Sequence, residues 1–138
     1  MSDEKYRQIS SKKDNCQQGH WTGIPKKGSG TGCWLCQYGC IILSYLKWKG
    51  LEPNEENVTK YLNENADADW NAMGISKHPD FNAPCIGRLK TRSHFVYIKD
   101  SNCNVFDPGK RSNTSMKKSN VLFFYYSNLK YFIITLTF

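Results

Sequence analysis

A chain of 138 residues, of which 39% are hydrophobic and 14% aromatic, is large enough to bury one core, which excludes a wholly disordered protein. The net charge of +7 predicts attraction to polyanions. The lysines and arginines are nevertheless spread in small groups along the sequence, and no nucleic-acid-binding motif is present. We therefore expect a basic surface and no specific nucleic-acid partner.

The N-terminal segment, residues 1–14, is polar and lacks the apolar stretch of a secretory signal peptide. This predicts a polar N-terminal arm over residues 1–14 and a single domain over residues 15–138. A protein without such a signal is expected in a reducing compartment, where its six cysteines stay thiols and form no disulfides.

A buried helix is predicted from Cys40 to Lys49. Most of its residues are apolar or aromatic, it holds no proline, and Gly50 follows where a helix commonly ends. Gly39 permits a tight turn into the helix, so Cys40 lies in the first turn. The unpaired N–H groups and the positive end of the helix dipole favour a thiolate at that position.

The sequence after this helix predicts a second helix and then several strands. A proline and two glutamates open the second helix, which is predicted over residues 53–65. Runs of β-branched and aromatic residues predict strands over residues 93–99, 103–107, 121–126 and 131–138. This order indicates an α+β fold in which the buried N-terminal helix that carries the cysteine packs on a small antiparallel sheet.

The strands over residues 93–99 and 103–107 bring a histidine near an aspartate. If Asp100 and Ser101 form a two-residue hairpin loop, the numbers of paired residues sum to 201, and His94 lies directly opposite Asp107. Side chains opposed in this way lie roughly 5 Å apart at Cβ, so a carboxylate can hold an imidazole N–H. Cys40, His94 and Asp107 then supply a nucleophile, its base and the group that orients the base.

A collinear series of short motifs runs through roughly residues 15 to 110. The series consists of Gln17 and Trp21, Gly28-Ser29-Gly30-Thr31-Gly32, Tyr38-Gly39-Cys40, Pro53-Asn54-Glu55-Glu56, Asp69-Trp70, His94-Phe95-Val96 and Asp107-Pro108-Gly109. In this order the motifs resemble those of papain-like cysteine peptidases. The closest resemblance is to the stand-alone bacterial and phage relatives of the peptidases that cleave bacteriocin leader peptides.

The resemblance implies a papain-like fold and a thiol-dependent hydrolase of peptide or amide bonds, with Cys40, His94 and Asp107 as the catalytic residues. It also suggests Gln17, or its neighbour Gln18, as a donor that stabilises the oxyanion together with the backbone N–H of Cys40. Two tryptophans, Trp21 and Trp70, are weaker candidates for contact with a peptide substrate. No metal and no organic cofactor are implied.

The cysteines leave other interpretations open. Cys33 follows a glycine and is an alternative nucleophile, if a longer helix begins there. Cys33 and Cys36 have the spacing of a redox pair, and together with Cys40 they suit zinc or an iron–sulfur cluster. A further alternative is a catalytically inactive protein that keeps the fold and binds a peptide.

For the enzyme, the expected substrate is a protein, a peptide or the stem peptide of peptidoglycan. We expect a monomer that is cytoplasmic or virion-associated and that acts on the cell wall only after release. The segment over residues 121–138 is rich in apolar residues but is interrupted by Ser127, Asn128 and Lys130. Because these polar residues lie in its middle, no membrane span is expected.

Overall fold

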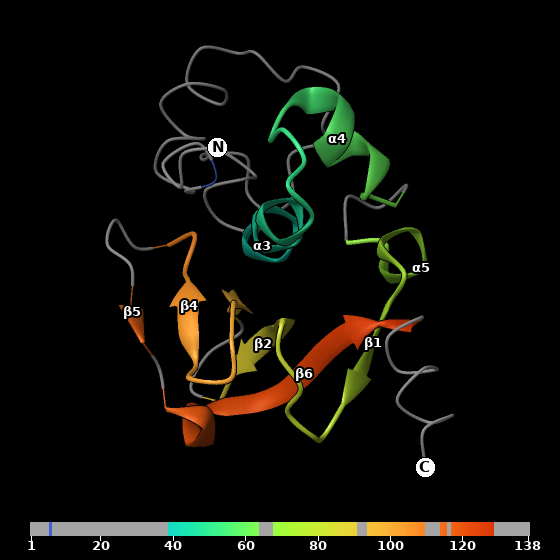
Figure 1. Ribbon diagram of the computed structural model, residues 1–138. Helices are drawn as coiled ribbons and strands as arrows, with labels where there is room; N and C mark the ends of the chain where they lie inside the picture. The colour runs from blue at the N-terminus through green and yellow to red at the C-terminus, as the bar shows by residue number, and fades with distance from the viewer. Residues whose placement is uncertain are drawn as a thin grey trace.

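The computed structural model describes residues 6, 39–63, 68–90, 94–109, 114–115 and 117–128. In this part of the chain a helix lies across one face of an antiparallel sheet (Figure 1), so the predicted α+β class is confirmed. The elements are α3 (Cys40–Lys49), α4 (Glu55–Lys60), α5 (Trp70–Met73), β1 (Ile75–His78), β2 (Cys85–Leu89), β3 (Phe95–Ile98), β4 (Asn104–Phe106), β5 (Thr114–Ser115), a 3-10 turn (Lys118–Asn120) and β6 (Val121–Ser127).

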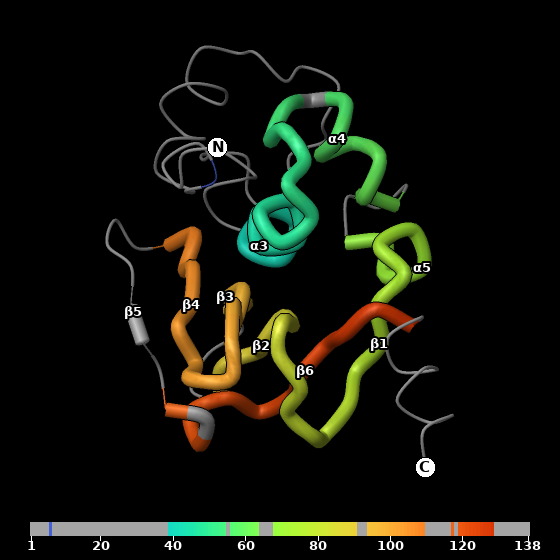
Figure 2. Tube along the Cα trace, viewed as in Figure 1, coloured from blue at the N-terminus to red at the C-terminus, as the bar shows by residue number. Residues whose placement is uncertain are grey.

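The sheet has six strands in the order β1-β6-β2-β3-β4-β5, and every neighbouring pair is antiparallel. Strand β6 follows the other strands in sequence but lies between β1 and β2 (Figure 2). Strand β3 lies in the interior of the sheet, where β2 and β4 hydrogen-bond to it on either side. The residue that opens β3 is therefore held by a backbone that is fixed on both edges.

Helix α3 is found at the bounds that the sequence predicts. Its residues from Cys40 to Leu46 are all buried, which agrees with the nearly continuous apolar run of that segment. Gly50 ends the helix in the left-handed conformation, with φ of 67°, and its N–H bonds the carbonyls of Leu46 and Lys47. Glycine adopts this conformation without steric cost, and a lysine in the last turn complements the helix dipole.

Helix α4 is shorter than the predicted helix over residues 53–65. Asn54 is its N-cap, because the Asn54 side chain accepts a hydrogen bond from the Asn57 N–H at 2.9 Å. The helix then ends at Lys60, and Leu62 forms a β-bridge with Ala68. The asparagine cap thus displaces the start from Pro53, and pairing with a later segment stops the helix early.

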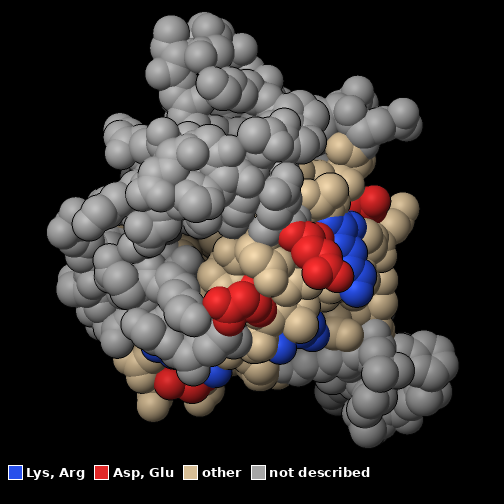
Figure 3. Space-filling model, turned by 90° about the horizontal axis from the view of Figure 1, so that it is seen from above, with Lys and Arg blue, Asp and Glu red and all other residues tan. Residues whose placement is uncertain are grey.

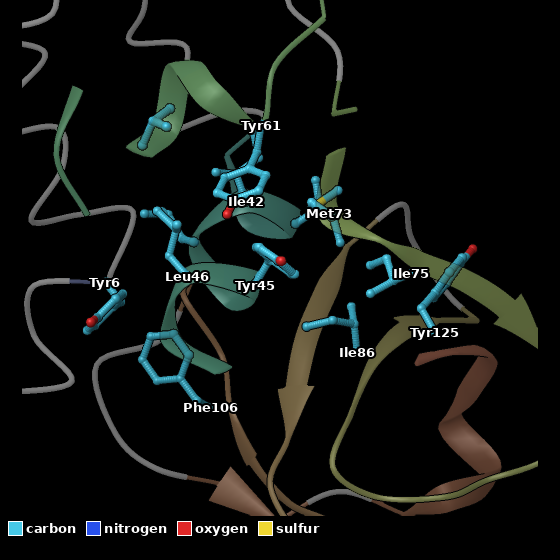
Figure 4. Packing of buried hydrophobic residues seen from close by; sticks show 13 residues of the cluster. Tyr6, Ile42, Tyr45, Leu46, Tyr61, Met73, Ile75, Ile86, Phe106 and Tyr125 are labelled. Carbon is cyan, nitrogen blue, oxygen red and sulfur yellow. The ribbon is translucent and has the colours of Figure 1, made fainter. Parts of the chain in front are cut away.

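Two hydrophobic clusters occupy the two faces of the sheet. The cluster on the face toward α3 includes Ile42 and Leu46 from the helix and Ile86 from β2 (Figure 4). The cluster on the other face includes Val96 and Ile98 from β3, together with further residues of β2, β4 and β6. Successive residues of a strand point to opposite faces, so both faces of the central strands are buried.

Tyr6 is the one residue of the predicted N-terminal arm that the structure describes, and it is fully buried. Its hydroxyl donates a hydrogen bond to the Leu51 carbonyl at 2.8 Å, and its ring meets Phe106 edge-on with centroids 6.3 Å apart (Figure 4). The Lys47 Nζ lies 5.3 Å from the Tyr6 ring centroid. At Tyr6, therefore, the chain packs into the cluster on the α3 side and is not solvated.

Among the described helices, none combines the length and the apolar character that crossing a bilayer requires. The predicted strand over residues 131–138 lies outside the described residues. The predicted strand over residues 121–126 is confirmed as β6, which extends one residue further.

Candidate active site

Cys40 is the first residue of α3 and is only 7% exposed. The N-cap is Gly39, which has no side chain to accept a hydrogen bond from the first turn, and no acidic residue lies in that turn. The first N–H groups of a helix have no partner within the helix. The free N–H groups of the first turn therefore lie at the N-terminus of α3, beside the Cys40 thiol, where they favour negative charge.

Helix α3 lies along β3, and three successive helical turns each meet the strand. The Cys40 thiol lies beside His94 and raises the pKa of its imidazole, the Ser44 hydroxyl donates to the Phe95 carbonyl at 3.4 Å, and the Trp48 ring stacks on Tyr97 with centroids 6.3 Å apart. Eight helical residues rise about 12 Å, and three strand residues span about 10 Å. The rise along α3 thus nearly matches the rise along β3, and this match places the Cys40 thiol beside the His94 imidazole.

Ser44 belongs to this arrangement, although it is not among the site residues predicted from the sequence. Its side chain is fully buried, and its position four residues after Cys40 places it on the same side of α3. A buried hydroxyl needs a hydrogen-bond partner, and the carbonyl next to His94 supplies it. The signal in the sequence was a polar residue inside an apolar helical run, at helical spacing from the thiol.

The predicted register of the β3–β4 hairpin is wrong by two residues. Tyr97 pairs with Phe106 and Ile98 with Val105, so the numbers of paired residues sum to 203 and Asp107 is not directly opposite His94. The loop has four residues rather than two, because Lys99 N–H bonds the Asn104 carbonyl at 2.8 Å.

The aspartate that opens this loop explains the longer turn. Asp100 Oδ1 accepts hydrogen bonds from the N–H groups of Asn102 and Asn104, and Cys103 closes the loop in the left-handed conformation with φ of 58°. Hydrogen bonds from Asn104 lower the pKa of the Asp100 carboxyl. A side chain that binds its own following backbone in this way defines a turn that loop length alone does not predict.

His94 and Asp107 nevertheless form a direct contact. His94 immediately precedes β3 and Asp107 immediately follows β4, so both lie at the same end of the sheet. His94 Nε2 lies 2.6 Å from Asp107 Oδ1, and the two residues are 8% and 1% exposed. A register shift of two residues converts a directly opposed pair into a diagonal pair but preserves the face on which both lie.

One carboxylate oxygen serves two purposes in this site. Asp107 Oδ1 also accepts a hydrogen bond from the Gly109 N–H at 2.8 Å, which closes the turn at Asp107-Pro108-Gly109. The orienting role and the turn-capping role of Asp107, which the sequence offers as competing interpretations, are thus performed by the same atom. The turn holds the carboxylate in place for the imidazole.

The pKa of the His94 imidazole is shifted by the groups around it. Burial lowers its pKa, but hydrogen bonds to Asp107 and Cys40, together with the charges of these two groups, outweigh burial and raise it to about 9. Because Asp107 occupies Nε2, Nδ1 is the ring nitrogen left to face the thiol. The two nitrogens have exchanged the roles they take in a Ser-His-Asp triad, in which the carboxylate holds Nδ1.

Not all predicted site residues lie in the described part of the chain. Gln17, Gln18, Trp21, Cys33 and Cys36 lie outside it. Of the other cysteines, Cys85 is buried in the cluster on the far face of the sheet and Cys103 lies in the hairpin loop. Within the described ranges, no group of three or more His, Cys, Asp or Glu side chains could hold a metal ion.

Trp70 is brought near the site but is mainly a packing residue. It is partly exposed, and its ring stacks on Tyr125 with centroids 4.8 Å apart and lies 5.9 Å from Phe95, the residue after His94. The face seen in Figure 3 carries described acidic and basic side chains in small separate groups, with no broad surface of one sign.

Comparison with protein-family models, with curated proteins and with solved structures gives no match to this chain.

The raised pKa of His94 predicts a pH-dependent contribution to stability. A histidine whose pKa rises from about 6.5 in the unfolded chain to about 9 in the folded protein stabilises the fold fully below pH 6.5 and loses this effect as the pH rises through 9. The free energy of unfolding of the native protein, minus that of His94→Gln, should therefore fall over this range by up to roughly 3 kcal/mol. A pH-independent difference in chemical denaturation would contradict the assignment.

The double role of Asp107 predicts different effects for two substitutions. Both substitutions lose the charge that stabilises the His94 imidazolium, but Asp107→Asn keeps an oxygen for the Gly109 N–H, whereas Asp107→Ala leaves that group unpaired and should lower the free energy of unfolding by about 1–3 kcal/mol more than Asp107→Asn. Both remove the negative charge beside His94 and should slow alkylation of Cys40 by iodoacetamide at pH 6. Equal stability of the two variants, or native alkylation rates in both, would be the contrary result.

Proposed function

We propose that this protein is a cysteine-dependent hydrolase that cleaves a peptide or amide bond through Cys40, His94 and Asp107. One observation carries the proposal: a buried thiol at the start of a helix lies beside an imidazole whose Nε2 is held at 2.6 Å by a buried carboxylate, and both groups raise the pKa of that imidazole. A nucleophile, its base and an orienting group in contact are the minimal parts of nucleophilic acyl transfer.

Each residue has a defined role in the proposed reaction. His94 Nδ1 takes the thiol proton of Cys40 as the sulfur attacks the carbonyl carbon of the scissile bond. The C–N bond then breaks as the His94 imidazolium protonates the departing amine, which leaves a thioester on Cys40. A water molecule, deprotonated by His94, attacks the thioester, and the thiol is released with the carboxylic acid product.

The negative charge that develops on the carbonyl oxygen has a donor in the described part of the site. The backbone N–H of Cys40 is in the first helical turn, where no capping side chain competes for it. Gln17 is proposed as the second donor on the strength of the resemblance to papain-like peptidases. Two donors aimed at the same oxygen stabilise a tetrahedral intermediate more than the ground state.

The raised pKa of His94 supports its role as the acid of the reaction. With a pKa of about 9, raised by Asp107 and Cys40, the imidazole is readily charged at neutral pH, and the imidazolium is the form that protonates the departing amine. The papain-like resemblance favours a protein or the stem peptide of peptidoglycan as the substrate.

The test combines labelling with product analysis. At pH 6, iodoacetamide should alkylate Cys40 faster than Cys85 and Cys103, which are buried thiols on the far face of the sheet and in the β3–β4 loop. Incubation with purified cell walls and with a panel of proteins, followed by mass spectrometry, should reveal new termini. Cys40→Ala should reduce their formation by about a thousandfold or more, while Cys85→Ala serves as the matched control.

Two results would contradict the proposal. New termini that persist in Cys40→Ala would assign the cleavage to another group. Uniformly slow alkylation of all cysteines, with no product from any substrate, would instead favour the inactive peptide-binding protein.

A further inference from the structure

A positively charged side chain lies in the middle of the sheet, one residue from the end that carries the site. Arg88 on β2 pairs with Phe95 on β3 and with Phe123 on β6, and the next residue, Leu89, donates its N–H to the His94 carbonyl at 3.0 Å. Directly paired residues have Cβ atoms about 5 Å apart. The side chain of Arg88 therefore starts beside the residue that follows His94.

The face on which Arg88 lies is that of the thiol. Ile86, two residues earlier on β2, belongs to the cluster under α3, and alternate residues of a strand share a face. Phe95 and Phe123 pack against the same cluster. Burial raises the pKa of Tyr125, another member of this cluster, and the positive charge of Arg88 opposes that rise, in keeping with its place on this face.

Aromatic rings surround this position. Trp70 contacts Phe95 on β3 and Tyr125 on β6, and so reaches across β2, which lies between these two strands. Phe95, Phe123 and Trp70 are all partly exposed. On the far side, the Lys77 Nζ lies 4.3 Å from the Phe123 ring centroid and adds a second cation to the same face. Arg88 and three partly exposed aromatic rings thus lie together on one face of the sheet.

The guanidinium of Arg88 is partly exposed and makes no hydrogen bond or ion pair with any residue in the described ranges. Asp69, the residue before Trp70, accepts a hydrogen bond from the Ala72 N–H as the N-cap of α5. A guanidinium beside apolar rings is poorly hydrated and offers a planar fork of donors that matches a carboxylate. A ligand that combines a carboxylate with an apolar stem complements this surface in both charge and polarity.

We propose that Arg88, with the rings of Trp70, Phe95 and Phe123, forms a subsite for an acidic side chain of the peptide substrate, next to the scissile bond held at Cys40 and His94. The inference rests on the proposed function and specifies its substrate class. The carboxylate of a substrate glutamate or aspartate lies on the guanidinium, and its methylene stem lies against the rings.

The test uses peptidyl chloromethyl ketones, because they report on the region beside the thiol without a known substrate. The thiolate of Cys40 displaces chloride and forms a thioether, so the rate of inactivation measures how well the attached peptide binds. The probes are acetyl-Glu-Ala-Gly-chloromethyl ketone and acetyl-Ala-Glu-Gly-chloromethyl ketone, each paired with its glutamine counterpart. The native protein should react about tenfold faster with one glutamate probe than with its glutamine counterpart.

The variants separate charge from structure. Arg88→Gln should remove the preference for glutamate, Arg88→Glu should reverse it, and Arg88→Lys should retain part of it. Lys117→Gln, which removes an exposed charge on the loop before the 3-10 turn, is the matched control and should keep the native preference. Thermal unfolding of each variant verifies that the sheet is intact. If Arg88→Gln or Arg88→Glu does not fold, the preference for glutamate is compared between the native protein and Arg88→Lys.

The possible failures are distinguishable. If Cys40 is alkylated rapidly but glutamate and glutamine probes react equally, or if Arg88→Glu and Arg88→Lys both keep the native preference, the subsite is wrong while the hydrolase remains. If no probe alkylates Cys40 faster than Cys85, both the hydrolase and its subsite are wrong.

Discussion

The packing of α3 along β3 is the constraint on which the site depends. The contacts of Cys40, Ser44 and Trp48 with consecutive parts of the strand fix the helix both in position and in rotation about its axis. A rotation of the helix by one residue, about 100°, would turn the thiol away from His94 and bury a different face. The apolar cluster beneath α3 opposes such a rotation, because the seven residues from Cys40 to Leu46 are all buried.

The electrostatics of the site follow from this fixed geometry. Burial disfavours a charged imidazole, and only the contacts of His94 with Asp107 and Cys40 reverse that effect and bring its pKa to about 9. The carboxylate is itself buried, and the Gly109 N–H compensates part of its desolvation. The turn, the carboxylate, the imidazole and the thiol therefore form a linear series in which each group stabilises the next.

The sequence predicted the parts of this arrangement that depend on local signals. Helix α3 was predicted at its true bounds because an apolar run, a preceding glycine and a terminal Gly50 all indicate the same element. The contact between His94 and Asp107 was predicted although the register was wrong, since an even shift keeps two residues on one face. The loop of four residues depends on side-chain hydrogen bonds of Asp100, which loop-length rules do not contain.

The elements that the sequence did not predict are those with weak or non-local signals. Strand β2 contains Gly87, which is uncommon inside a strand, and the structure explains it, because a Cβ at that position would lie 2.8 Å from the Ile98 Cδ1. Strand β1 has four residues and α5 has four, too few to show a clear period. The placement of β6 between β1 and β2 is a long-range pairing that no local pattern encodes.

The most direct test of the account is the protonation state of His94. An NMR titration of its ring resonances in the native protein should give a midpoint near pH 9, in keeping with an imidazolium stabilised by Asp107 and Cys40. The midpoint should fall in Cys40→Ala and in Asp107→Asn, since each removes one of the stabilising partners. A midpoint at or below about 6.5, the ordinary value for histidine, in the native protein would contradict the account.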